Sequence, residues 1–190
     1  VWTFQPLPAR ARHELAHLAG VKAVESNRYV MVNLVNGHRR ERVQIRGYAA
    51  PAELYRVVDL HNQVRPLGGD GLLMTDRLAA KLGLRAGDRV QAEVLEGRPR
   101  TLQLTVEQLL PEMMGLNAYM RREALNHALG EGDIANSFVL SVDAADEPAL
   151  LDATRRMPGV AGAFSKFSLL RNMNEVTARN IRIMSTVLTA

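Results

Sequence analysis

The 190-residue chain is long enough for one medium domain or two small subdomains, and its 47% hydrophobic and 23% charged content is ordinary for a packed fold. It contains no cysteine, which excludes disulfides, thiolate metal sites and a cysteine nucleophile. Its 24 Lys/Arg and 20 Asp/Glu leave a net charge of +4, and aromatic residues make up only 5%. Scattered arginines with so few aromatic rings to stack on bases argue against nucleic acid as a partner.

The ends of the chain carry the membrane-related signals. No internal stretch reaches the about 18 to 20 apolar residues that a membrane-spanning helix needs, and no signal peptide opens the sequence. The last ten residues, Ile181 to Ala190, are largely apolar. We expect this run to form either the first turns of a membrane span or a C-terminal amphipathic helix that docks on the domain.

The first 48 residues combine one helix with a strand hairpin. Apolar residues at helical spacing predict a helix that Gly20 ends, and Asn36-Gly37 is a strong two-residue turn signal between two strand-like runs. The predicted elements are an apolar start, a helix, two strands and the returning strand of the hairpin: residues 1–4, 9–19, 21–24, 28–35 and 39–46.

Residues 49–133 differ in local composition from the segments before and after them. Pro51, Pro66 and a glycine-rich run at 68–71 mark the start of this range. The predicted elements here are a strand, a helix, the two strands of a hairpin and a second helix: residues 72–75, 76–82, 90–95, 102–106 and 121–129. We expect this range to be a small β-rich subdomain inserted into the rest.

A later segment repeats the first in outline. A strand over 137–142, a helix over 147–157, a stop at Gly159 and a strand over 160–167 follow the same order as the elements around Gly20. Two such units packed by pseudo-symmetry form a ferredoxin-like sheet with helices on one face.

The sequence therefore predicts an α+β fold made of a discontinuous split β-α-β subdomain, an inserted β-rich subdomain and a C-terminal helix leading to the membrane. The expected boundaries are 1–48 and 134–167 for the two halves, 49–133 for the insertion and 168–190 for the helix.

The sharpest local motif is His13-Glu14-Leu15-Ala16-His17, an H-E-x-x-H match. On a helix this spacing places two imidazoles one turn apart to hold Zn²⁺, with the glutamate as general base. The histidines point away from the apolar face of Leu15 and Leu18, so we expect them in solvent. No further histidine follows at the spacing that supplies a third ligand. A zinc metallopeptidase using His13, Glu14 and His17 remains the alternative hypothesis.

Other catalytic patterns are missing from the sequence. The glycine run at 68–71 lacks the Lys-Ser/Thr of a phosphate-binding loop, and no serine lies in a G-x-S-x-G turn. We therefore predict no catalytic, cofactor-binding or metal-ligating residue, no cofactor and no enzymatic activity in this chain.

The order of several short motifs resembles the periplasmic core domain of MacB/FtsX-like ABC transporter permeases, over nearly the whole chain. The motifs that carry the resemblance are Ala11–Glu25, Gly71–Thr75, Leu82–Val90, Glu93–Arg98 and Gly115–Met120. The resemblance implies two subdomains, called porter and sabre, which would correspond to the split sheet and its insertion.

The resemblance also implies a function. The domain would face the periplasm or cell exterior from the inner membrane, transmit conformational change driven by a separate cytoplasmic ATPase, and bind substrate or partner. Its partners would be that ATPase, the permease transmembrane helices, and a second periplasmic domain or envelope protein. Proline at Thr177 or Ala178 would break the last helix and uncouple transport. A free-standing envelope binding module is a further alternative.

Overall fold

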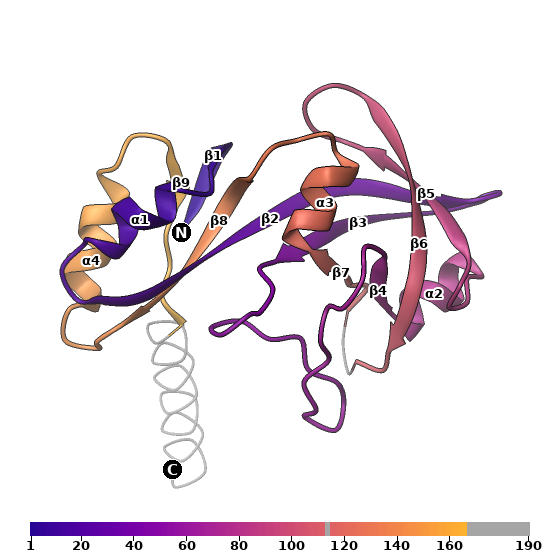
Figure 1. The fold of residues 1–190 in the computed structure, drawn as a ribbon, viewed down its shortest axis with the longest axis horizontal. Coiled ribbons are helices and arrows are strands. Elements are labelled where there is room, and N and C mark those ends of the chain that lie inside the picture. Colours follow the sequence, from indigo (N-terminus) through magenta and orange to yellow (C-terminus); the bar gives the residue numbers. More distant parts are fainter. Residues whose placement is uncertain (113–114, 167–190) are drawn as a thin grey trace, which may run out of the picture.

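The computed structural model describes residues 1–112 and 115–166. The predicted helix 168–190 and Phe167 lie outside these residues. The described chain is a sheet-rich α+β fold with short helices, which confirms the predicted class (Figure 1). Its elements are β1 (Trp2–Pro8), α1 (Ala11–Ala16), β2 (Val21–Asn36), β3 (Arg39–Tyr48), β4 (Leu72–Thr75), α2 (Asp76–Leu82), β5 (Arg89–Val94), β6 (Arg100–Leu110), β7 (Ala118–Arg121), α3 (Arg122–Ala128), β8 (Ile134–Val142), α4 (Glu147–Arg155) and β9 (Val160–Gly162).

One long strand, β2, runs through the whole molecule. Its first part, up to Asn27, pairs antiparallel with β8, and its second part, from Arg28, pairs with β3. Figure 1 shows β2 passing from the α1 and α4 side of the molecule to the side that holds α2 and α3. The chain therefore forms two bodies that share this strand.

The larger body is a closed ring of strands, here called the barrel. Strand β2 pairs with β3, β3 with β7, β7 with β4, β4 with β6, β6 with β5, and β5 again with β2. Alternate side chains fill its interior, as the two-residue period of a strand dictates. Val30, Val32 and Leu34 of β2 and Val43 and Ile45 of β3 belong to this core.

Two helices close opposite ends of the barrel. Helix α2 contributes Leu78 and Leu82 to the core and lies at the turn end of the β2–β3 hairpin, where Asn36 Nδ2 donates to the Leu82 carbonyl over 2.9 Å. Helix α3 contributes Leu125 and lies at the other end, against Gly47. Because the helices cover the strand ends, the apolar interior is sealed from water.

The smaller body is a sheet in the strand order β2-β8-β1-β9, here called the open sheet. Helices α1 and α4 accompany it, and Leu15 and Phe138 are central to its small core. The helices end earlier than predicted, with caps at His17 and Arg156, and Gly20 and Gly159 follow three residues later with positive φ angles, +81° and +87°. This conformation is strained for any residue with a Cβ.

Two local features differ from the sequence predictions. The apolar start predicted over residues 1–4 extends as strand β1 through Pro8, and proline is tolerated there because β9 pairs only with Trp2 and Thr3. The hairpin of residues 28–48, which the sequence division groups with the first segment, pairs with β5 and β7 of the 49–133 range. The reason is that β2 continues without interruption from one body into the other.

Candidate functional site

The most unusual feature of the molecule is a run of buried polar residues where β2 crosses between the two bodies. Ser26, Asn27 and Arg28 are each at most 1% exposed, although they occupy the middle of a strand. Buried polar groups are costly unless they are hydrogen-bonded, so the partners of Ser26 and Arg28 define how the bodies are joined. The buried Asn27 side chain has no hydrogen-bond partner within the described ranges.

Arg28 is the centre of this joint. Its Nε donates to Glu131 Oε2 over 3.2 Å, and its Nη1 donates to the Tyr29 carbonyl over 3.0 Å. Its Nη2 bonds Glu96 as well as Glu131. Because Glu96 follows β5 and Glu131 follows α3, one guanidinium attaches β2 to the β5–β6 turn and to the loop that leads into β8.

A second arginine ties α3 to the same place. Arg122 donates from Nη1 to the carbonyl and hydroxyl of Ser26, and its Nη2 pairs with Glu123 at 2.8 Å and Asp133 at 3.0 Å. Arg122 and Ser26 are buried, so the bonds between them are shielded from water, whereas the Glu123 and Asp133 carboxylates are 49% and 69% exposed. Helix α3 is thereby fixed to the last residues of the open-sheet part of β2.

An asparagine completes the joint on the β8 side. Asn136 Oδ1 accepts from the Tyr29 N–H and Asn136 Nδ2 donates to the Tyr29 carbonyl, both over 2.8 Å. Together with Arg28, Arg122 and their partners it forms what we call the junction network: Ser26, Arg28, Glu96, Arg122, Glu131, Asp133 and Asn136. Such networks specify one geometry more than they add net stability.

The sequence analysis did not find the junction network. Its only local signal was the polar break at residues 25–27, between the strand-like runs 21–24 and 28–35. The partners that explain the break are remote, since Arg28 and Glu131 are separated by 103 positions. No spacing rule connects residues that far apart.

A long loop, residues 49–71, lies over the outer face of the barrel and is also attached to β2. The Glu25 carboxylate accepts the backbone N–H groups of Glu53, Leu54 and Tyr55, the last two over 2.7 and 3.2 Å. Three donors on one carboxylate hold this end of the loop against the open-sheet part of β2.

All four tyrosines of the chain gather where this loop meets the barrel, and one of them, Tyr55, belongs to the loop. Tyr48 lies 6.1 Å from Tyr29, 5.0 Å from Tyr55 and 5.9 Å from Tyr119, measured between ring centroids, and Arg46 lies over the Tyr119 ring. Burial raises the pKa of Tyr48, and burial followed by the Glu112 carboxylate raises the pKa of Tyr119. The phenols of Tyr48 and Tyr119 therefore stay neutral.

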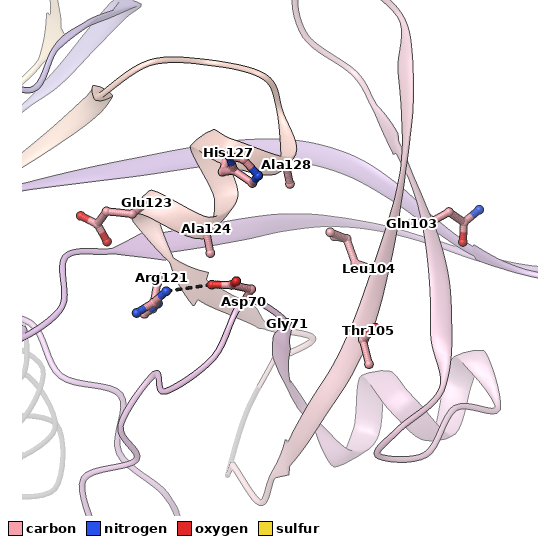
Figure 2. A pocket seen from close by; sticks show the side chains of 10 residues that line it. All are labelled: Asp70, Gly71, Gln103, Leu104, Thr105, Arg121, Glu123, Ala124, His127 and Ala128. Atoms are coloured by element: carbon pink, nitrogen blue, oxygen red, sulfur yellow. Dashed lines mark hydrogen bonds and ion pairs between the residues drawn. The ribbon is translucent and has the colours of Figure 1, made fainter.

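A cavity of about 410 Å³ lies between α3 and β6. In Figure 2, Leu104 and Ala124 face one another across it, Arg121 forms an ion pair with Asp70, and Glu123 points away. The Arg121 Nη2 to Asp70 Oδ1 distance is 2.7 Å. Because its charged groups pair with each other instead of converging on one point, we assign no ligand to this cavity.

The H-E-x-x-H residues lie on α1, where His13, Glu14 and His17 are all exposed and Leu15 is buried. This is the orientation that the helical period predicted. Within residues 1–112 and 115–166, no group of three His, Asp or Glu side chains is arranged to hold a metal ion. The structure therefore supplies no third ligand for the motif among the residues that it describes.

No family model and no curated protein sequence matches the chain. Solved structures do match. The extracellular domain of the noncanonic ABC-type transporter YknZ from Gram-positive bacteria is 16% identical, with a TM-score of 0.53, over 79% of this chain and 81% of that one. The periplasmic region of MacB from Actinobacillus actinomycetemcomitans is 14% identical, with a TM-score of 0.54, over 90% of this chain and 84% of that one.

The chain thus has the fold of the extracytoplasmic domains of ABC-type transporters. More particularly, the resemblance to the MacB-type domain that the sequence motifs indicated is confirmed as a likeness of fold over most of the chain. In the part of the chain that the structure describes, no helix has the length and hydropathy to cross a bilayer.

Proposed function

We propose that the chain is the extracytoplasmic domain of an FtsX-like ABC transporter permease, which transmits movement driven by a cytoplasmic ATPase and binds substrate or partner outside the inner membrane. The observation that carries this proposal is the two-body fold joined by β2, shared over most of the chain with two transporter domains. The chain itself would perform no catalysis.

The proposal includes a division into subdomains. Residues 1–48 and 134–167 would supply the split β-α-β, porter-like half, and 49–133 the sabre-like insertion, with the hairpin of residues 28–48 extending from the first half into the barrel. The strand order β2-β8-β1-β9 with α1 and α4 supports the first, because two strand-helix-strand units interleave there. The helix 168–190 would lead into a span, beside the other permease transmembrane helices and any second periplasmic domain or envelope protein.

The junction network suggests how movement would pass through the domain. A shift of the open sheet would pull β2 along its length, because the same strand pairs with β8 over residues 21–27 and with β3 over residues 28–36. At Arg28 the charged contacts to Glu96 and Glu131 couple the same strand to the turn beyond β5 and to the loop before β8. The barrel would therefore follow the open sheet as one piece, because a bend at this point breaks buried ion pairs.

The location outside the membrane has a direct test, because the chain lacks cysteine. Arg98 is exposed in the turn between β5 and β6, so Arg98→Cys adds one accessible thiol far from both termini. In intact cells that produce the chain within its parent protein, a membrane-impermeant maleimide should label this variant and leave the unmodified chain unlabelled. Labelling only after lysis would refute the proposed location.

A further inference from the structure

The open sheet carries three aromatic side chains at its β1–β9 edge. Phe4 is 76% exposed and Phe164 is 60% exposed, although both are large apolar groups. The Trp2 ring stacks on Phe164 with 4.6 Å between centroids and 28° between planes. Burial of such rings is favourable by about 25 cal/mol per Å² of apolar surface, so their exposure implies a partner for this face.

These rings form one surface because the strands that carry them lie side by side. Trp2 pairs with Gly162 across the β1–β9 ladder, and the Phe4 N–H donates to the Gly159 carbonyl over 3.0 Å. We call Trp2, Phe4 and Phe164 the aromatic edge. Its strands, β1 and β9, lie with α1 and α4 in the open sheet (Figure 1).

The chain segments around the aromatic edge carry an excess of positive charge, with Asp152 as the nearest acidic residue along the chain. Residues 1–10 and 153–166 contain four Lys/Arg and no Asp/Glu, so the rest of the chain balances its 20 Lys/Arg against all 20 Asp/Glu. The four are Arg10, Arg155, Arg156 and Lys166. Arg156 pairs with Asp152 at 2.5 Å, but both side chains are mostly exposed, which leaves the arginine accessible to another anion.

We propose that the aromatic edge binds an anionic lipid surface, with the three rings at headgroup depth and Arg155, Arg156 and Lys166 against the lipid phosphates. Aromatic rings beside Lys/Arg are what the membrane interface selects, because the rings tolerate both apolar and wet surroundings and the cations meet negative charge. An apolar protein partner alone would not explain this excess of positive charge. The proposal deepens the proposed function, since it makes the open sheet the part of the domain that rests on the bilayer.

The test uses Trp2, which is the single tryptophan of the chain. The 190-residue chain is mixed with vesicles of phosphatidylglycerol and, separately, of phosphatidylcholine. We expect a blue shift of tryptophan emission and quenching by brominated acyl chains with the anionic vesicles only. No spectral change with either vesicle would overturn the proposal, and a shift that depends on protein concentration without vesicles would show self-association instead.

Variants separate the contributions in a vesicle co-sedimentation assay, with circular dichroism to verify folding. The double variant F4S/F164S should lose about tenfold or more in binding, and the triple variant R155Q/R156Q/K166Q about fivefold for each charge removed. Leu95→Ser, at an exposed apolar residue of the barrel, is the matched control and should bind normally. Equal losses for the control and the aromatic variant would contradict the assignment. Failure here leaves the maleimide result at Arg98→Cys unaffected, so the two proposals fail separately.

Discussion

Arg28 Nε donates to Glu131 Oε2 over 3.2 Å, and this bond joins two residues that are 103 positions apart. Only 2% of the Arg28 side chain is exposed, whereas its partners Glu96 and Glu131 are 35% and 22% exposed. The arginine is thus the buried member of the group, and both carboxylates contact it from partly exposed positions. The strand, the β5–β6 turn and the loop after α3 meet at one guanidinium.

Replacing Arg28 with methionine keeps an unbranched apolar stem but removes the guanidinium, with its charge and every donor. We expect the free energy of unfolding to fall by about 2 to 4 kcal/mol, because Glu96 and Glu131 lose their cation. Urea denaturation monitored by circular dichroism measures this. In the parent transporter, Arg28→Met should abolish export while ATP hydrolysis continues.

Arg40→Met is the matched control for that experiment. Arg40 pairs with Glu93 at 2.9 Å, but its side chain is 57% exposed, so the loss should be below about 1 kcal/mol and export should persist. Equal effects at Arg28 and Arg40, on stability and on export, would contradict a special role for the junction network.

The two glycines that follow α1 and α4 allow a second prediction. Gly20→Ala should destabilise the domain by about 2 kcal/mol or more, because its φ is positive and the new Cβ would collide with the Asp146 side chain. Gly159→Ala has the same backbone strain but open space around it, so we expect about 1 kcal/mol. Thermal unfolding of both variants gives the comparison.

Gly132 provides the reference for the glycine variants. It has no positive φ and nothing within 4 Å of a built Cβ, so Gly132→Ala should change stability by less than about 0.5 kcal/mol. If all three alanine variants are equally stable, the left-handed conformation assigned to Gly20 and Gly159 is wrong.

These glycines also show what the sequence could reveal. The glycines after the helices and the hairpin turn are local signals, because a positive φ favours glycine directly. The turn itself is Gly37-His38, one residue beyond the predicted Asn36-Gly37, since Asn36 pairs with Arg39. The continuity of β2 was missed because residues 25–27 look like a polar break between the predicted strands 21–24 and 28–35. Inside the strand, Ser26 bonds Arg122 of α3. Arg28 bonds Glu131 before β8 and Glu96 in the β5–β6 turn.

The closure of the barrel was equally hidden from the sequence. The parallel pairing of Ile45 with Ala118 and of Leu72 with Val106 joins strands far apart in the chain, and pattern reasoning finds the strands but not their neighbours. The tyrosine cluster could not be predicted for the same reason, since it depends on which strands are neighbours. Ala118 and Met120 point into the barrel core, and Tyr119 between them points to the outer face.

Glu25 offers a test of how the long loop is held. Glu25→Ala removes the acceptor for the N–H groups of Glu53, Leu54 and Tyr55, so we expect faster hydrogen exchange at these amides while the barrel strands stay protected. Hydrogen exchange with mass spectrometry resolves the two regions. Glu25→Gln keeps one acceptor oxygen and should give an intermediate rate. Unchanged exchange over 53–55 in the alanine variant would exclude the contact.

Asp59 makes the same loop sensitive to acid. Its Oδ1 accepts from the N–H groups of Gln63 and His61, and its Oδ2 accepts from Arg65 Nε over 2.9 Å. These bonds, the Gln63 N–H first, hold the pKa of Asp59 below its ordinary value. A carboxyl with a lowered folded pKa stabilises above its unfolded pKa of about 3.9, and that stabilisation disappears as the pH falls through the folded pKa.

The amide resonances of His61 and Gln63 should therefore titrate together at a pH below about 3.9. Arg65→Gln removes one stabilising cation and should move this midpoint upward, towards the ordinary value. In Asp59→Asn the two amides should show no acid transition, because no carboxylate remains to accept from them. A midpoint at or above about 3.9 in the unmodified chain would mean that the carboxylate does not hold the loop as described.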